Sequence, residues 1–294
     1  MIVVTAPTGR IGRLTLERLL AADAAVRVIV RDPARLPAAT RARVEVVQGT
    51  HGDPEVVNDA FAGADALFWL VPADPRSPSV EEAFVGFSRP AAQAVKDQGV
   101  KRVVNVSALG RGTPVADRAG FVTASLAVDD LFASTGVSLR ALAMPSFMEN
   151  LLRQTELIRT EGLFTMPVSG SLKAPACAVA DIAAVAAGLL LDDTWTGVGE
   201  VPVLGPEDLS FDEMARIMSD ELQRPIRFQP VSPAEVKDRM MEFGMSEPMA
   251  QAYADMAVAK DAGLDNGVTR TPEGSTPTSF RQWCRDVLRP AVLG

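Results

Sequence analysis

Short runs of β-branched and aliphatic residues alternate with helical patterns through the first half of the chain. The strand candidates are residues 2–5, 26–30, 44–47, 66–71, 102–106 and 138–143. Helical periodicity between them predicts helices near residues 10–21, 54–62, 79–98 and 118–135. Repeated strand–helix units with right-handed crossovers cover both faces of a parallel sheet. This order therefore predicts an α/β fold with a doubly wound parallel sheet.

The regular alternation of strand and helix patterns ends after Phe147. Longer helical patterns follow, with only two further strand candidates, at residues 200–204 and 226–228. The pairs Ser210/Glu213 and Ser232/Glu235 are capping boxes, and they predict helices that begin at residues 211 and 233. Residues 262–279 lack periodicity and predict a loop before a final helix near 279–288.

These patterns divide the chain into two expected parts. Residues 1–150 form the Rossmann-like domain, joined by some return of chain from 175–205, and residues 151–294 form a smaller, mainly helical cap lobe.

Composition and charge narrow the class of protein. The 294 residues are 47% hydrophobic and 22% charged, which is typical of a globular protein. The net charge of -8, without a basic run, argues against a direct nucleic-acid partner. Cys177 and Cys284 match no metal spacing, and the longest apolar stretch, residues 182–191, is too short to span a membrane. We expect a cytoplasmic protein with no membrane contact and no bound metal.

A glycine-containing loop directly follows the first strand and opens the first helix. Gly9 and Gly12 occupy the last two positions of a G-x-x-G-x-x-G pattern, whereas Ala6 stands at the first. Such a loop lets the backbone approach a pyrophosphate, and the helix N-terminus offers free N–H groups to it. The sequence therefore predicts dinucleotide binding by the loop residues Thr5, Ala6, Thr8, Gly9, Arg10, Ile11 and Gly12. The methyl group of Ala6 disfavours a positive φ angle at this turn.

The residue at the end of the second strand indicates which cofactor is preferred. Arg31 stands where an acidic residue would hold the ribose 2′-hydroxyl of NAD(H), and a guanidinium there suits a 2′-phosphate instead. Arg10 is a second candidate for the same phosphate, and Asp32 is expected to cap the short helix that follows it. NADP(H) is the predicted preference, with NAD(H) possible.

The chain resembles the NmrA-like proteins of the atypical short-chain dehydrogenase/reductase group over nearly its whole length. The resemblance rests on the motifs at residues 4–12, 28–33, 46–49, 100–110, 145–150, 204–207 and 278–280. It implies that Thr50 lies near the adenine, that Leu70, Val71 and Pro72 follow the ribose, and that Ser107, Pro145, Ser146 and Phe147 lie near the nicotinamide. It also implies a small-molecule substrate in the cleft below the cap lobe, walled by Met144, Phe147, Met148 and Asn150.

The sequence departs from the reductase pattern at the acid that normally donates a proton. Phe121 and Ser125 occupy the places of the usual Tyr-x-x-x-Lys pair, so neither can perform that chemistry. Tyr253, the only tyrosine, is expected to pack in the cap lobe, and the only histidine, His51, is expected in a surface loop. Catalytic residues are not identified, and Ser107 is the nearest candidate.

Two functions are compatible with these features. One is an NAD(P)H-dependent oxidoreductase, a reductase that passes hydride to an apolar or aromatic, quinone-like acceptor without a Tyr-Lys pair. The alternative is a non-catalytic NADP(H)-binding redox sensor that reports to a protein partner. A large apolar cavity beside the nicotinamide favours the first, and a filled cleft favours the second.

Overall fold

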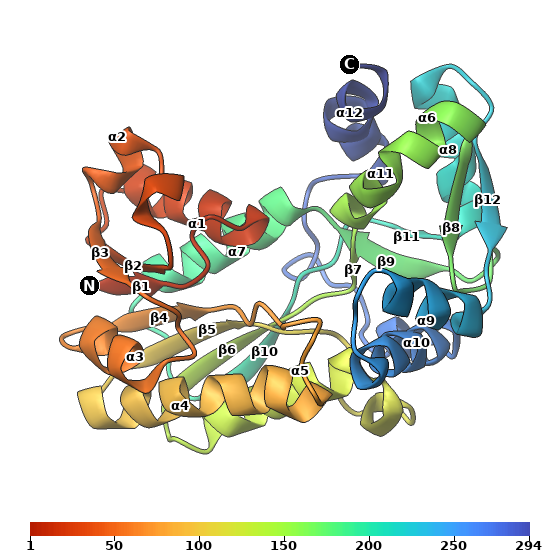
Figure 1. Cartoon of the computed structure of the whole chain (residues 1–294). Helices are drawn as coiled ribbons and strands as arrows, with labels where there is room; N and C mark the ends of the chain where they lie inside the picture. Colours follow the sequence, from red (N-terminus) through yellow and green to blue (C-terminus); the bar gives the residue numbers. More distant parts are fainter.

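The computed structural model describes residues 1–294, and a parallel sheet of seven strands forms its centre (Figure 1). Its strands are β1 (Ile2–Val4), β2 (Val26–Val30), β3 (Glu45–Gln48), β4 (Ala66–Trp69), β5 (Arg102–Val106), β6 (Ser138–Ala143) and β10 (Val198–Pro202). They lie in the order β10-β6-β5-β4-β1-β2-β3, with every neighbouring pair parallel. The predicted doubly wound, Rossmann-like sheet is confirmed, and the order reverses between β1 and β4.

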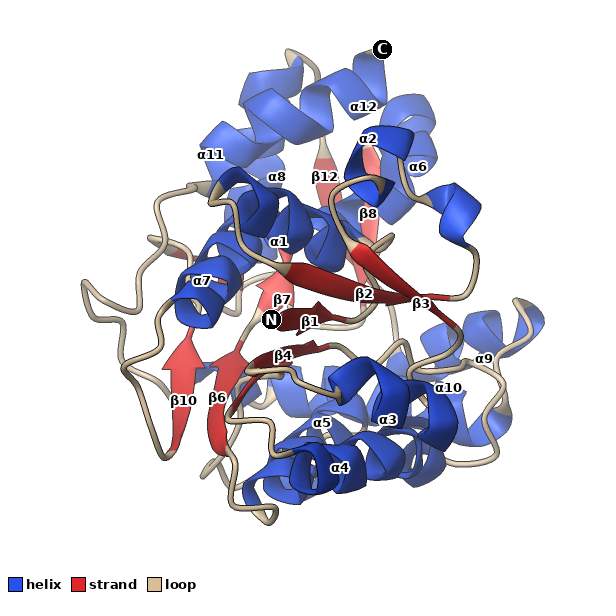
Figure 2. Cartoon of the chain, turned by 90° about the vertical axis from the view of Figure 1, so that its left-hand side faces the viewer, coloured by secondary structure: helices blue, strands red, loops and turns tan.

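Helices cover both faces of this sheet (Figure 2). One face carries α1 (Arg10–Ala21) and α7 (Val179–Leu191), and the other carries α3 (Pro54–Phe61), α4 (Phe87–Gln98) and α5 (Phe121–Ala133). A core of 22 buried residues fills the first interface and one of 18 fills the second. The strands alternate between these cores, since Val4 belongs to one and Val3 to the other.

Short helical turns connect these elements. They are the 3₁₀ turns η1 (Pro33–Arg35) and η3 (Ala116–Arg118), the helix α2 (Ala38–Arg41), and the π-helical turn η2 (Glu82–Gly86) that leads into α4. Asp32 caps η1 as expected, because its Oδ1 accepts a hydrogen bond of 3.0 Å from the Ala34 amide.

The second half of the chain contributes the helix α7 and the strand β10 to the layers of the large sheet. Helix α7 packs along α1, and β10 then pairs with β6 in parallel from Val198 opposite Leu139 to Pro202 opposite Ala143. Because β10 runs parallel to β6, the chain leaves β10 for the cap lobe beside the carboxyl ends of β5 and β6.

The cap lobe contains more strands than the sequence indicated. Its helices are α6 (Thr155–Glu161), α8 (Phe211–Leu222), α9 (Pro233–Glu242), α10 (Glu247–Asp261), α11 (Phe280–Trp283) and α12 (Arg289–Leu293), with the turns η4 (Met148–Gln154), η5 (Leu264–Asn266) and η6 (Cys284–Leu288). Its strands are β7 (Ser146–Phe147), β8 (Leu163–Met166), β9 (Ala174–Cys177), β11 (Asp208–Leu209) and β12 (Arg227–Pro230).

Both predicted capping boxes are present, at Ser210 with Glu213 and at Ser232 with Glu235. The expectation of only two strands after Phe147 was wrong, because β8 pairs with β12 and β9 with β7 and β11. Strand β9 has the sequence Ala-Pro-Ala-Cys, which carries neither alternation nor β-branched residues and so gives no strand signal. No helix is both long and apolar enough to cross a membrane.

Candidate cofactor and substrate site

The loop after β1 is held close to the start of α1. A Cβ atom added to Gly12 would lie 2.2 Å from the Ala6 carbonyl oxygen, so only glycine allows this approach. Ala6 itself has a φ of +48°, in the left-handed region that a glycine at this place would adopt without strain. The turn therefore keeps the geometry of the glycine pattern despite the alanine.

The N-terminus of α1 fits a phosphate group. Gly9 is the N-cap residue and no side chain caps this end, so the first backbone N–H groups are free to bind an anion. The Thr5 hydroxyl donates to the Phe68 carbonyl at 2.9 Å and accepts from the Leu70 amide at 3.1 Å. This bridge fixes the ends of β1 and β4, where the strand order reverses, relative to each other.

The arginines expected to recognise a 2′-phosphate have different surroundings. The exposed guanidinium of Arg31, directly after β2, makes no hydrogen bond or ion pair within the protein. Arg10 instead donates to the Glu149 carbonyl at 3.1 Å, across the cleft toward the cap lobe. Thr50 is exposed in the loop after β3. Arg31 is thus the unpaired cation at the edge where the adenosine half of a dinucleotide is expected.

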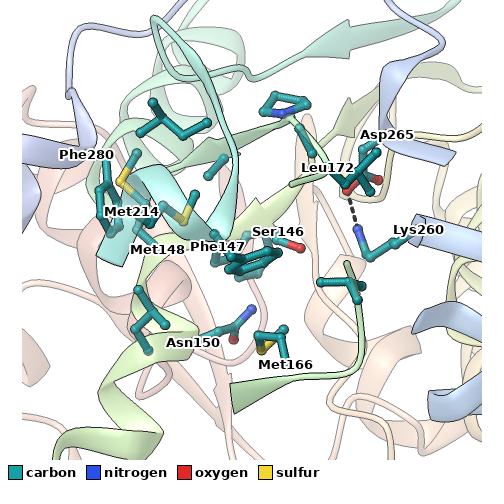
Figure 3. A pocket seen from close by; sticks show the side chains of 17 residues that line it. Ser146, Phe147, Met148, Asn150, Met166, Leu172, Met214, Lys260, Asp265 and Phe280 are labelled. Carbon is teal, nitrogen blue, oxygen red and sulfur yellow. Dashed lines mark hydrogen bonds and ion pairs between the residues drawn. The ribbon is translucent and has the colours of Figure 1, made fainter. Parts of the chain in front are cut away.

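An apolar pocket opens beside the segment that follows β6 (Figure 3). It holds about 700 Å³ of empty space, including its mouth, and 12 of its 17 lining residues are hydrophobic. Three of the residues expected to wall the substrate line it, namely Phe147, Met148 and Asn150. Ser146, expected near the nicotinamide, lines it too, whereas Met144 is packed in the core beneath α1 and α7. The mostly hydrophobic lining is typical of a site for an apolar small molecule.

Comparison with known proteins agrees with this geometry. The sequence matches the family described as NAD(P)H-binding over residues 7–193. The chain belongs to this NAD(P)H-binding family. The expected membership of an NAD(P)-binding Rossmann family is therefore confirmed.

Several proteins similar to this chain are named as reductases. The chain is 31% identical to (4-alkanoyl-5-oxo-2,5-dihydrofuran-3-yl)methyl phosphate reductase of Streptomyces griseus, over 96% of both chains. It is 28% identical to the NAD(P)H azoreductase of Xenophilus azovorans, over 87% of this chain and 86% of that one. The crystal structure of triphenylmethane reductase from Citrobacter sp. complexed with NADP(H) superposes with a TM-score of 0.78, at 23% identity and 99% coverage of both chains. That likeness establishes the shared fold.

A buried polar network lies at the end of β5 in this NAD(P)H-binding protein. The Ser107 hydroxyl donates to Asp129 Oδ2 at 2.5 Å, and the Asn105 amide donates to Asp129 Oδ1 at 2.6 Å. Burial raises the pKa of Asp129 to about 6 against the effect of these hydrogen bonds and of Arg111, which lies 3.7 Å away. Ser107 thus has a carboxylate partner rather than a His or Lys.

Sequence reasoning missed Asp129, although a signal was present. Residues 121, 125 and 129 are spaced four apart on α5, so they share the helix face that turns toward the ends of β5 and β6. Phe121 is the residue expected in the place of the usual tyrosine. Its ring packs against Phe84 at 5.8 Å and edge-on against Tyr253 at 6.2 Å between ring centroids. Tyr253 therefore packs against the Rossmann-like half, from α10 in the cap lobe.

His51 was expected on the surface, and this expectation was wrong. Its ring is 7% exposed and packs edge-on against Trp69 and Phe87, each at 5.0 Å between centroids. Its Nε2 hydrogen-bonds the Leu70 carbonyl at 3.0 Å, so the imidazole supports the segment expected along the ribose. Desolvation lowers the pKa of His51 to about 4, against the effect of the Leu70 hydrogen bond.

The remaining predicted residues flank the cleft. Leu70 and Val71 are half-buried after β4, Pro72 is exposed, and Pro145 is buried between β6 and β7. No group of three or more His, Cys, Asp or Glu side chains is arranged to hold a metal ion. Cys177 and Cys284 are buried free thiols, and burial raises the pKa of both.

Proposed function

We propose that this protein is an NADP(H)-dependent reductase that passes hydride to an apolar, aromatic small molecule such as a quinone. The observation that carries the proposal is the apolar pocket lined by Ser146 and Phe147, which follow β6 at the carboxyl end of the sheet. A reductase needs an apolar cavity there, whereas a sensor that only binds the cofactor does not. The similarity to an azoreductase and to a triphenylmethane reductase supports an aromatic acceptor.

The choice of NADP(H) over NAD(H) rests on the unpaired charge of Arg31. A guanidinium with no partner in the protein can form a bidentate pair with a 2′-phosphate. The uncapped N-terminus of α1 and the close approach at Gly12 suit the pyrophosphate. The NADP(H) bound to the structural relative from Citrobacter sp. supports the same preference.

The residues of this chain provide alignment and exclude water rather than provide an acid. A bound nicotinamide cofactor supplies the hydride. Phe147 and Met148 form the apolar wall that orients the acceptor, and Ser146 and Asn150 add polar groups to it. Because Phe121 cannot donate a proton, the acceptor must be one whose reduced anion is stable enough to take its proton from solvent. Quinones meet this requirement and simple ketones do not, whereas a cationic dye becomes neutral when it takes up hydride and needs no proton.

The test follows the oxidation of NADPH and NADH by the purified protein with a panel of naphthoquinones, azo dyes and triphenylmethane dyes. Wild-type protein should consume NADPH with at least one acceptor. Arg31→Ala should raise the KM for NADPH about tenfold or more, because a charged hydrogen-bonded pair is lost, and should leave the KM for NADH unchanged.

Arg18→Ala is the matched control, since Arg18 is exposed in the last turn of α1 and makes no ion pair. This variant should behave as wild type with both cofactors. Tight NADPH binding without turnover of any acceptor would replace the proposal with the sensor, and equal effects of Arg31→Ala on NADPH and NADH would refute the cofactor assignment.

A further inference from the structure

One ion pair lies in the wall of the otherwise apolar pocket. Lys260 is in the last turn of α10 and Asp265 is in η5, and their Nζ and Oδ2 atoms are 2.5 Å apart (Figure 3). Their side chains are only 17% and 5% exposed. They are the only two charged residues in the lining, so its net charge is zero.

The Lys260 ammonium has donors to spare. An ammonium has three N–H groups, and Asp265 is the only protein group that accepts from this one. Across the pocket, the Ser146 hydroxyl makes no hydrogen bond within the protein and lies on the side that faces Lys260 (Figure 3). These donors and the Asn150 amide line a cavity whose remaining walls are mostly apolar, and the second carboxylate oxygen of the ion pair, Asp265 Oδ1, is buried without a hydrogen-bond partner. The polar groups of the ion pair can therefore take up a polar group of a bound molecule.

We propose that Lys260, held in place by Asp265, binds a carbonyl oxygen of the hydride acceptor, so that the pocket selects neutral carbonyl-bearing aromatics. This inference rests on the proposed function and names its substrate class. The apolar body of the acceptor packs against Phe147, Met166 and Met214, and its oxygen lies between Ser146 and Lys260. The quinones are the class of acceptor that combines these features.

The charge of the lining decides against anionic acceptors. Asp265 already neutralises Lys260, and no arginine or second lysine lines the pocket. A phosphate dianion would lack partners there and would be repelled by Asp265. This pocket therefore differs in specificity from that of the Streptomyces griseus relative, whose name gives a dihydrofuranone that carries a phosphate group as its substrate.

The ion pair can also stabilise the negative charge that forms on the acceptor during the reaction. When the acceptor takes up the hydride with its electron pair, electron density moves onto the carbonyl oxygen and leaves an oxyanion. An ammonium N–H aimed at that oxygen stabilises the oxyanion more than the neutral carbonyl. A proton from solvent then completes the hydroquinone; a bound reduced nicotinamide cofactor would supply the hydride. The acceptor gains two electrons and two protons in all, one of the protons as hydride.

The test compares Lys260→Met with wild type on two acceptors. With a neutral naphthoquinone, kcat/KM should fall about tenfold or more, because the charged hydrogen bond is lost. With a cationic triphenylmethane dye, which has no carbonyl oxygen, kcat/KM should be unchanged or higher. Titration of the naphthoquinone into protein loaded with NADP⁺, where no turnover occurs, should show a similar loss of affinity.

Two further variants distinguish a role of Lys260 in binding the acceptor from a general disturbance of the structure. Lys260→Met/Asp265→Asn removes both charges, so it leaves no buried charge unpaired and should show the same selectivity between acceptors. Lys237→Met breaks an ion pair outside the pocket, in which Lys237 Nζ lies 2.6 Å from Glu247 Oε1. This variant should leave kcat/KM unchanged with both acceptors.

A parallel loss with both acceptors in the double variant, or no loss with either, would overturn the inference. If wild-type protein turns over no acceptor, the proposed function fails. The titration still decides whether Lys260 binds the quinone.

Discussion

His51 is a single buried side chain that supports the segment expected to contact the cofactor and that also affects the stability of the folded protein. Its imidazole fills a space between Trp69 and Phe87 and hydrogen-bonds the Leu70 carbonyl, in the segment expected to follow the ribose. Because burial holds the pKa of His51 at about 4, the folded protein keeps this ring neutral where the unfolded chain protonates it. The unfolded state therefore binds the additional proton as the pH falls from about 6.5 to about 4.

The first prediction follows from this difference in proton binding. As the pH drops through this window, His51 should lower the free energy of unfolding of the wild type by at most about 3 kcal/mol, while Asp129, whose pKa is raised to about 6 in the folded protein, acts in the opposite direction. His51→Gln keeps a donor for Leu70 but cannot titrate, so its stability should fall less steeply between pH 6.5 and 4. Urea unfolding of both proteins across this range measures the slopes, and parallel slopes would show that His51 does not carry the effect.

Ala6 is strained in the turn that should hold the pyrophosphate. An L-residue in the left-handed region costs about 1 kcal/mol, which glycine avoids. Ala6→Gly should therefore raise the free energy of unfolding by about 0.5–1 kcal/mol without weakening NADPH binding. Ala184→Gly, within α7, is the control and should lower it by about 1 kcal/mol. Thermal and urea unfolding compare the two, and a loss of stability in Ala6→Gly would contradict the strain at this position.

At the scale of elements, the contact between α5 and α10 joins the cap lobe to the Rossmann-like half. Gly120, with a φ of +54°, precedes α5, and a Cβ atom there would lie 1.9 Å from the Ala252 carbonyl oxygen of α10. Helix α10 carries Lys260 into the pocket and Tyr253 against Phe121. The docking of this helix thus sets the position of the pocket's only cation.

Gly120→Ala should displace α10. We expect the free energy of unfolding to fall by more than about 2 kcal/mol, since both backbone strain and a backbone clash are introduced. Gly99→Ala is a matched control, because Gly99 has a φ of +66° and nothing within 4 Å of an added Cβ atom. It should lose only about 1 kcal/mol. Hydrogen exchange should rise in α10 only in Gly120→Ala, and unchanged exchange there would refute the role of this contact.

The elements that the sequence predicted were those with strong local patterns. The six N-terminal strands are β-branched runs between amphipathic helices, and both capping boxes mark helix starts by local hydrogen bonds. Strands β8 and β9 were missed because they carry only one β-branched residue between them, Thr165, and form through pairing with β12, β7 and β11. Tertiary pairing, rather than local propensity, makes them strands.

At the scale of the whole molecule, the cofactor loop was predictable and the pocket was only partly so. Gly12 and Arg31 are placed by one strand–helix unit each, so sequence order alone locates them. Lys260 and Asp265 reach Ser146 from more than a hundred residues away, through the return of the chain and the docking of α10. No local pattern predicts that these residues line the same pocket. The spacing of residues 121, 125 and 129 on α5, in contrast, was a signal for the partnership of Ser107 with Asp129.

The central claim is that a bound NADP(H) passes hydride to an apolar acceptor in this pocket. The most direct measurement is the oxidation of NADPH that carries deuterium on one or the other face of nicotinamide C4, with a naphthoquinone as acceptor. Hydride transfer in this pocket predicts oxidation that depends on the acceptor and is slowed by deuterium on one face only, because only one face of the nicotinamide would be turned toward the acceptor. Tight binding of NADPH without oxidation, or oxidation with no isotope effect on either face even in a single turnover, would contradict hydride transfer at this site.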